Sequence, residues 1–391
     1  MMNVMVKRTL VVLLLSVAGF TRAAAGPVQV DTLKIGVVSA LTGPGSEWGL
    51  AMDGAAKIMA MEVNAKGGLK VGSKTYKVEV ISYDDQYKAA LAVTGATRLI
   101  EQDKVKFVVG PLGSAALLAV KPLWERNKML AIIGSYTDKA LDANTKYMFR
   151  ACMTQVEYAN PIVQWLKKNR PALKTIAELE PNDETGWFSQ KLLKERYESA
   201  GYILTASELF ERSLKDFQPL LTRILATKPD IIELGMTPPT TAGLVVRQAR
   251  ELGFKGQFVK IGSPGAREIV AAAGKEFTED LIGYGAADIT KPEYKNLASE
   301  YAKVLKPPMN QSTVCFYNSV SMMFDAIQTA GTVEDTDKVR TAMENLTQYK
   351  GLQGNIHWGG MKSYGSNHQV LSPTFIGAIR DGKEVIIDRI E

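Results

Sequence analysis

The alternation of strand-like and helical segments is the feature that most constrains the fold. In the N-terminal part, apolar runs typical of buried strands occupy residues 33–40, 76–85, 105–110 and 129–134. Helical patterns occupy residues 48–68, 88–103 and 114–128, the last with Pro122 as an expected kink or break. Such alternation predicts parallel sheets with helices on both faces.

The same order resumes after residue 153 and then changes. Strand patterns occupy residues 174–180, 202–210, 229–235 and 256–262. Helical patterns occupy residues 155–169, 186–200, 216–227 and 240–252. Residues 291–347 are mostly helical in pattern, 352–360 suggest a short strand, and 374–388 suggest a hairpin that turns at Asp381-Gly382. The sequence therefore predicts an α/β fold with two doubly wound parallel-sheet lobes.

The N-terminus has the three parts of a secretory signal peptide. Lys7 and Arg8 precede an apolar stretch over residues 10–20, and three alanines end at Ala25. We expect cleavage near Ala25 and a periplasmic protein. Removing residues 1–25 takes away three basic residues and no acid, which lowers the formal net charge from +6 to +3. With no dense block of Lys and Arg, no nucleic-acid partner is expected.

The two cysteines and two histidines give little support to a metal or catalytic site. Cys152 and Cys315 could pair after export, and we favour two separate buried thiols. His357 and His368 accompany no zinc motif and no G-x-S-x-G motif. The glycines at 43–49 miss the dinucleotide fingerprint by one residue. We predict no cofactor and no metal, although a Ser-His-Asp arrangement stays possible.

Three loops at predicted strand ends carry the candidate binding residues. They span residues 41–48, 111–114 and 135–137. In open α/β sheets, ligands bind beyond the carboxyl ends of the strands, where helix starts present unpaired N–H groups to anions. Gly113 would let backbone approach a ligand, and Ser114 and Thr137 could each give a hydroxyl and an N–H to a carboxylate. The alternative for Ser114 is an ordinary helix N-cap.

Aromatic and acidic residues near these loops allow two interpretations each. Trp48, Tyr136 and Trp187 either stack on a ligand or pack against their own domain. Asp84 and Asp85 either form a catalytic pair or, as we favour, have separate roles: one caps the helix that follows and the other is solvated. The acids Glu180, Asp183 and Glu184 are interpreted as a solvated rim, with contact to a ligand amine as the minority alternative.

Several stretches together resemble a known family. They are IGVVSALTGPGSEWG (35–49), EVNAKGGL (62–69), YDDQ (83–86), VKFVVGPLGS (105–114), TRILATKPDIIELG (222–235) and VVRQARELGFKGQFV (245–259). From about residue 33 onward, the chain resembles the type I periplasmic binding proteins of ABC importers, in their leucine/isoleucine/valine-binding branch. The resemblance implies two lobes that close on a ligand, with crossings near 150–154, 284–288 and 362–372.

The resemblance also implies lobe limits and residue roles. The N-terminal lobe would comprise residues 26–151 and 286–364, and the C-terminal lobe residues 152–285 and 365–391. Ser114 falls on the serine that holds the ligand carboxylate, and Thr137 on a threonine that binds the head group. Ser135 falls where a backbone carbonyl meets the ligand ammonium. Trp48 replaces an aromatic residue that covers the ligand side chain.

The second lobe departs from the family pattern at three positions. Pro264 occupies the place of the acid that holds the ammonium, and Thr185 and Thr237 stand where aromatic residues are expected. An unpaired buried ammonium is costly. The ligand is therefore either an aliphatic amino acid or a carboxylate without an α-amine, such as an aromatic acid.

These features favour a substrate-binding component of an ABC importer. It would deliver a small carboxylate-bearing solute to the permease and its ATPase subunits, as a monomer and without catalysis. Two alternatives are a sensory module for a membrane receptor and, less favoured, an exported enzyme that uses Asp84, Asp85 or a histidine.

Overall fold

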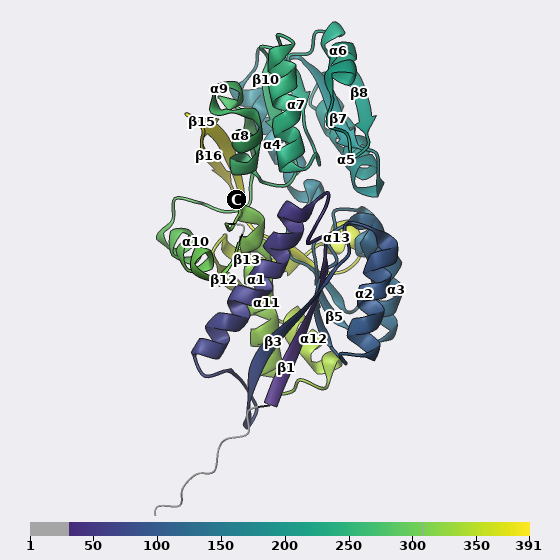
Figure 1. The fold of residues 1–391 in the computed structure, drawn as a ribbon, viewed down its shortest axis with the longest axis vertical. Coiled ribbons are helices and arrows are strands. Elements are labelled where there is room, and N and C mark those ends of the chain that lie inside the picture. Colours follow the sequence, from purple (N-terminus) through teal and green to yellow (C-terminus); the bar gives the residue numbers. More distant parts are fainter. Residues whose placement is uncertain (1–30, 307) are drawn as a thin grey trace, which may run out of the picture.

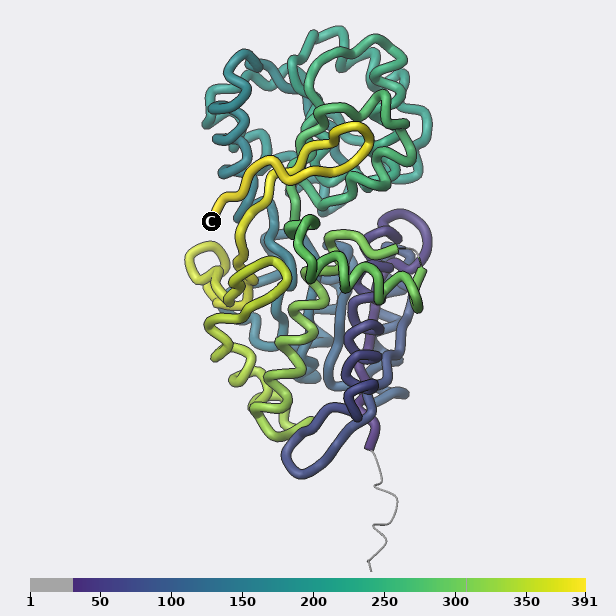
Figure 2. The backbone as a smooth tube through the Cα atoms, turned by 90° about the vertical axis from the view of Figure 1, so that its left-hand side faces the viewer, coloured from purple at the N-terminus to yellow at the C-terminus, as the bar shows by residue number. Residues whose placement is uncertain are grey.

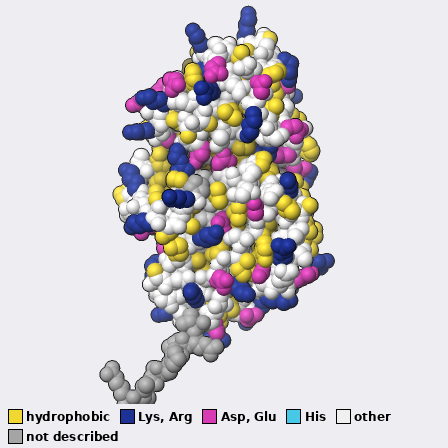
Figure 3. All heavy atoms as spheres, in the orientation of Figure 1, with side chains coloured by type: hydrophobic (Ala, Val, Ile, Leu, Met, Phe, Trp, Pro, Cys, Tyr) yellow, Lys and Arg dark blue, Asp and Glu magenta, His cyan; other side chains and the backbone are white. Residues whose placement is uncertain are grey.

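The computed structural model describes residues 31–306 and 308–391, so the expected signal peptide lies outside the described residues. Two α/β lobes stack along the long axis of the molecule (Figure 1). Of the helices in the described ranges, none has the length and apolar character needed to cross a membrane. Basic and acidic side chains are interspersed over both lobes on the face seen in Figure 3.

The first lobe is built on a nine-stranded mixed sheet. Its strands are β1 (Asp31–Ser39), β2 (Leu69–Val71), β3 (Lys74–Asp84), β4 (Phe107–Val109), β5 (Leu130–Ile133), β6 (Met148–Arg150), β12 (Tyr349–Gly351), β13 (Gly354–Gly359) and β14 (Gln369–Leu371). The order is β12-β13-β14-β6-β5-β4-β1-β3-β2. The six strands from β14 to β3 run parallel, and antiparallel strands close both edges.

Helices cover both faces of this sheet (Figure 1). They are α1 (Ser46–Ala65), α2 (Ala89–Glu101), α3 (Ser114–Arg126), α10 (Pro292–Val304), α11 (Gln311–Ala330), α12 (Thr336–Glu344), α13 (Met361–Tyr364) and the 3-10 turn η1 (Asp138–Ala140). Successive residues of β1 face opposite layers: Val37 packs in the core with α1 and α11, and Val38 in the core with α2 and α3. A parallel sheet buried on both faces explains the continuous apolar runs in the sequence.

Pro122 does not end α3, which continues to Arg126. The expectation of a break at this residue is therefore wrong. Val120 and Trp124 flank the proline and are both fully buried in the core beneath the helix. Burial of these neighbours holds the helix together despite the missing backbone donor.

The second lobe is built on a seven-stranded sheet. Its strands are β7 (Thr175–Pro181), β8 (Ile203–Phe210), β9 (Ile231–Glu233), β10 (Gln257–Lys260), β11 (Ile282–Gly285), β15 (Thr374–Arg380) and β16 (Lys383–Ile390), in the order β16-β15-β11-β10-β9-β7-β8. Its helices are α4 (Gln155–Asn169), α5 (Glu184–Ser199), α6 (Gln218–Ala226), α7 (Pro239–Glu251), α8 (Ala266–Ala273) and α9 (Lys275–Thr278). The predicted C-terminal hairpin is confirmed, with Asp381 and Gly382 both at positive φ in the turn.

The chain passes between the two sheets three times (Figure 2). The passages follow β6, β11 and β14, which end at Arg150, Gly285 and Leu371. Because β14 pairs with β6, residues 369–371 lie in the first sheet. We therefore propose lobes of residues 31–150 with 286–371 and 151–285 with 372–391, which moves the third boundary from the one expected at 365. Cys152 and Cys315 are buried free thiols.

Candidate ligand-binding site

The order of strands places the candidate site. In the first sheet β1 lies between β3 and β4, and in the second β7 lies between β8 and β9. At each position the connections turn to opposite sides, which opens a crevice at the carboxyl ends of the strands. The two crevices face each other where the lobes meet.

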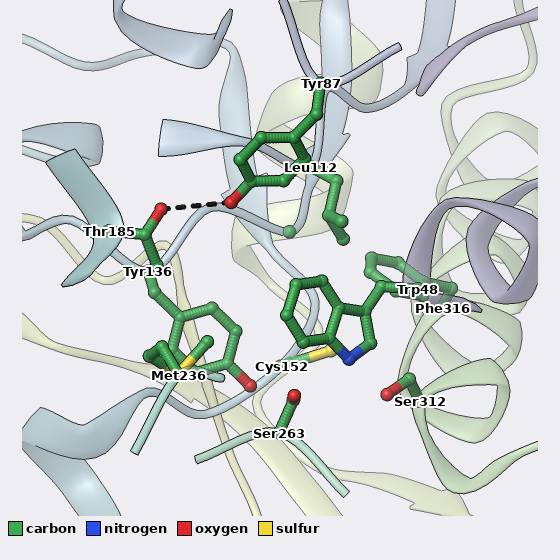
Figure 4. A pocket seen from close by; sticks show the side chains of 11 residues that line it. Trp48, Tyr87, Leu112, Tyr136, Cys152, Thr185, Met236, Ser263, Ser312 and Phe316 are labelled. Atoms are coloured by element: carbon green, nitrogen blue, oxygen red, sulfur yellow. Dashed lines mark hydrogen bonds between the residues drawn. The ribbon is translucent and has the colours of Figure 1, made fainter. Parts of the chain in front are cut away.

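A small cavity of about 20 Å³ lies between these strand ends (Figure 4). Its lining comprises Trp48, Tyr87, Leu112, Gly134, Tyr136, Cys152, Thr185, Met236, Ser263, Ser312 and Phe316. Loops after strands of both lobes supply most of this lining, and α11 supplies the last two residues. All of these described side chains are uncharged at neutral pH, and most are apolar.

Ser114 is the centre of a hydroxyl cluster beside the cavity. It is 1% exposed, and its Oγ accepts hydrogen bonds from the hydroxyls of Thr185 (2.9 Å) and Ser135 (3.3 Å). The backbone N–H of Thr137 also donates to it (3.3 Å). The structure thus brings four predicted residues together, with Thr185 reaching across from the second lobe.

The start of α3 does not have Ser114 as its N-cap, which was the alternative considered for this residue. The N-cap is Gly113, without a side-chain cap, and Ser114 is the first helical residue. The interpretation of Ser114 as an N-cap is therefore wrong. A glycine cap leaves the first-turn N–H groups without a side-chain acceptor, which is the arrangement that suits an anion.

Hydrogen bonds from residues outside the cavity hold the loop that contains Thr137. The Thr137 hydroxyl accepts the backbone N–H of Lys139 (3.4 Å) at the start of η1. Its carbonyl accepts a hydrogen bond from Arg150 Nη2 (3.0 Å), and Arg150 is fully buried over the ring of Tyr364. This support orients the loop against Ser114 before any ligand arrives.

Trp48 and Tyr136 both line the cavity and also pack against the hydrophobic core, so each combines the two interpretations. Trp187 does not line it: its side chain is half-exposed and its Nε1 donates to Asn182 (2.8 Å). Thr237 and Pro264 are also outside the lining. The Thr237 hydroxyl donates to the Leu179 carbonyl (3.2 Å), and Pro264 lines a neighbouring small cavity.

In both second-lobe loops the lining residue is the one before the residue expected. Met236 and Ser263 line the cavity where Thr237 and Pro264 were expected. An aligned motif locates a loop to within a residue or so, whereas the turn of each loop decides which side chain faces inward. Sequence reasoning therefore found the correct loops with a shifted residue in each.

Asp84 and Asp85 shape the loops that hold the aromatic lining. Asp84 accepts the hydroxyl and N–H of Thr42 and the N–H of Leu41 (2.9 Å). Burial alone would raise the pKa of Asp84, but these hydrogen bonds hold the pKa below its ordinary value. Burial raises the pKa of Asp85 to about 6. The N-cap of α2 is Lys88, so the expectation that one of the two aspartates caps this helix is wrong.

Tyr87 and Arg212 were missed by sequence reasoning. The Tyr87 hydroxyl lies 3.1 Å from Thr185 Oγ1, as the dashed line in Figure 4 marks. The Arg212 guanidinium lies over the Tyr87 ring (4.5 Å to the centroid) and pairs with Asp183. Tyr87 directly follows the family stretch YDDQ (83–86), whereas Arg212 lies in a polar loop outside the family stretches. Their contact exists only because the lobes meet, so the sequence could not predict it.

The three acids expected at a solvated rim have separate structural roles. Glu180 is fully buried, which raises the pKa of its carboxyl. Its carboxylate accepts hydrogen bonds from the Ser189 hydroxyl and the Met236 N–H. Asp183 caps α5, and Glu184 pairs with Lys139 across the lobes (2.9 Å). Glu180 therefore contradicts the expectation of a solvated rim.

Two α/β lobes whose crevices share one cavity define a two-lobed solute-binding architecture. The model of the periplasmic binding protein family matches residues 32–384. The chain belongs to this family, in its type I, leucine/isoleucine/valine-binding branch. The family is one of solute-binding proteins, not of enzymes. Within the described ranges, no cluster of His, Cys, Asp and Glu could hold a metal ion.

Relatives and solved structures match over nearly the whole chain. A leucine-, isoleucine-, valine-, threonine- and alanine-binding protein of Pseudomonas aeruginosa is 27% identical over 90% of this chain and 92% of its own. A leucine-binding protein from Thermotoga maritima superposes with a TM-score of 0.80 at 20% identity, over 92% and 99% of the chains. A Rhodopseudomonas palustris solute-binding protein in complex with benzoate superposes with a TM-score of 0.79 at 16% identity. The match covers 92% of this chain and 96% of that protein.

Proposed function

We propose that this protein captures a small carboxylate-bearing solute in the interlobe cavity and delivers it to the permease of an ABC importer in the periplasm. The observation that carries the proposal is the hydroxyl cluster at the start of α3. Ser114 accepts hydrogen bonds from both lobes, so its own O–H proton is available for a ligand oxygen. The uncapped first turn of α3 adds backbone donors and a favourable helix dipole.

The proposal assigns the head group to Ser114, Ser135 and Thr137, with Thr185 closing over it from the second lobe. In the closed arrangement, the hydroxyls of Thr185 and Tyr87 form a hydrogen bond with each other, and the Thr185 hydroxyl also donates to Ser114. A bound carboxylate would take over part of these contacts and so bridge the lobes. Binding energy that differs between the open and closed forms is what shifts such an equilibrium.

The uncharged lining favours an acid without an α-amine over an amino acid. The relatives and neighbours bear names for two ligand chemistries, branched-chain amino acids and benzoate. None of the described side chains that line this cavity is a carboxylate, and Glu180 behind Met236 is already satisfied by protein donors. An ammonium buried here would have no ionic partner among these side chains, which is costly.

The test is binding to a panel of amino acids, aromatic acids and short-chain acids. A true ligand raises the melting temperature with its concentration, because it binds the folded form alone. For the strongest ligand, we expect Ser114→Ala to weaken affinity by about tenfold in calorimetry, since one hydrogen bond to a charged group is lost.

Ser319→Ala is the matched control, because Ser319 is also fully buried but lies on α11 and takes no part in the hydroxyl cluster around Ser114. The control variant should bind as the unmodified protein does. Equal affinity of Ser114→Ala and the unmodified protein would remove Ser114 from the site. Delivery is tested by ligand-stimulated ATPase activity of the cognate permease in membranes.

A further inference from the structure

The cavity has a second polar end, opposite the hydroxyl cluster. In Figure 4 the Thr185–Tyr87 contact lies on one side, and the indole nitrogen of Trp48 lies on the other with the hydroxyls of Ser263 and Ser312. Apolar side chains separate the two ends. They are Leu112, Cys152, Met236, Phe316 and the ring of Tyr136, whose hydroxyl lies toward Ser263 in Figure 4.

Two of the polar groups at this second end are unsatisfied. Trp48 Nε1 and Ser263 Oγ are buried and have no hydrogen-bond partner among the residues that the structure describes. Each of the two side chains belongs to a residue that is 4% exposed, and Ser312 is 6% exposed. A buried donor without a partner costs stability, so native proteins almost always satisfy one.

Trp48 differs from other buried unsatisfied groups because it faces a cavity together with further polar groups. Trp124 Nε1 is also buried and unpartnered in the described part of the chain, but it lies in the core beneath α3. Trp48 instead shares the cavity wall with two serine hydroxyls from different elements, the loop after β10 and the first turn of α11. Three groups that can donate toward one space form a site for an acceptor.

We propose that the ligand carries an uncharged hydrogen-bond acceptor, a hydroxyl or carbonyl oxygen, at the end opposite its carboxylate. This inference rests on the proposed function, because it takes the hydroxyl cluster as the carboxylate end. The indole N–H can only donate, so it selects an acceptor. A plain alkyl or phenyl end would leave these donors without a hydrogen-bond acceptor.

The electrostatics of the second end favour a neutral acceptor over a second carboxylate. The described lining contains no cationic side chain. Arg212, whose guanidinium lies 5.9 Å from the Trp48 ring, is already paired with Asp183. A second buried carboxylate would therefore meet no cationic side chain in this lining, which is costly.

The test compares two ligand pairs that differ at the far end alone. The pairs are benzoate with 4-hydroxybenzoate and 4-methylpentanoate with the isosteric 4-oxopentanoate, titrated calorimetrically into the unmodified protein. We expect the oxygen-bearing member of at least one pair to bind about tenfold more tightly. Trp48→Phe keeps an aromatic ring and removes the N–H, so it should abolish most of that preference. Ser263→Ala should reduce it, and Trp124→Phe is the matched control that should preserve it.

The outcomes separate this inference from the proposed function. If acids bind and Ser114→Ala weakens their affinity, the proposed function stands. The inference is nevertheless overturned if neither ligand pair shows a preference, or if Trp48→Phe lowers the affinity of both members of a pair equally. If none of these acids or the wider acid panel binds, the proposed function itself fails. The indole N–H resonance of Trp48, assigned through Trp48→Phe, should shift further with the oxygen-bearing ligand than with its partner.

Discussion

Glu233 is the buried carboxyl whose surroundings are most completely defined. It is fully buried, and it accepts hydrogen bonds from the hydroxyl of Tyr197 (2.6 Å) and the N–H groups of Ile261 (2.7 Å) and Gly235 (2.9 Å). Burial raises the pKa of Glu233 to about 7, despite these donors and the nearby Lys260. The folded protein therefore holds a proton that the unfolded chain releases near pH 4.5.

We expect Glu233→Gln to flatten the pH dependence of stability between about pH 4.5 and 7. Because the folded pKa is raised, the stability from this carboxyl is complete below pH 4.5 and is lost as pH rises through 7. The loss is of the order of 3 kcal/mol. Glutamine resembles the protonated acid and loses no proton. Urea unfolding at several pH values measures the slope, and exposed Glu79→Gln serves as the control. An unchanged slope in Glu233→Gln would contradict the assignment.

Residue types at the site were predictable where a motif fixes them. Tyr136 in the loop after β5, and Trp48 and Thr185 in the first turns of α1 and α5, line the cavity as expected positions beyond strand ends. Tyr87 and Arg212 were unpredictable, because a cation over an aromatic ring depends on two loops from different lobes. The pattern of residues along the chain does not indicate how far the two lobes close.

The first turn of α5 connects helix capping with the cavity. Asp183 accepts the N–H groups of Thr185 (3.0 Å) and Gly186 (3.1 Å), and it also pairs with Arg212. The carboxylate thus positions the Thr185 hydroxyl and holds the cation beside Tyr87. One side chain fixes the part of the second lobe that meets Ser114.

We expect Asp183→Ala to be about 1 kcal/mol less stable than Asp183→Asn in urea unfolding. Both substitutions remove the charge that pairs with Arg212, but asparagine retains an oxygen that caps the helix. Both variants should also be less stable than the unmodified protein, because Arg212 is left largely buried without its partner. Equal stabilities of the two variants would show that the cap contributes nothing measurable.

Elements with a strong period or a continuous apolar run were predictable from sequence, and four short strands outside such runs were not. The long helices α1 to α7 match their predicted segments to within a few residues. The strands β2, β6, β11 and β14 have only three or four residues each, and the sequence analysis missed all four. Their pairing comes from backbone contacts with neighbours already in place, and a run of three residues has no usable periodicity.

The molecule is in a closed arrangement held by contacts between lobes. Tyr87 meets Thr185 and accepts a hydrogen bond from Arg212 Nη2 (3.3 Å), and Lys139 pairs with Glu184 on the rim. The two lobes themselves were predictable from the repeated alternation, and so were three crossings from the family resemblance. Their closure was not, because it depends on a small free-energy difference between two arrangements of the same elements.

We expect Tyr87→Phe to shift the ligand-free protein toward an open form. Phenylalanine keeps the ring under Arg212 and loses the hydroxyl that joins the lobes. Small-angle X-ray scattering should give a larger radius of gyration without ligand, and affinity should fall a few-fold as the closed fraction falls. Tyr83→Phe is the control, because the Tyr83 hydroxyl bonds Asp103 within the first lobe (2.9 Å). Identical scattering from both variants would exclude Tyr87 as a closing contact.

The late position of β14 affects how the chain can fold as it is synthesised. The nine-stranded sheet receives β12, β13 and β14 only after residue 348, when the strands β7 to β11 of the second sheet have already been synthesised. An emerging chain can complete the central strands of the second sheet first, while β6 keeps an unpaired edge. A truncation just before β14 should therefore damage the N-terminal lobe, although the deleted residues follow most of the second lobe in sequence.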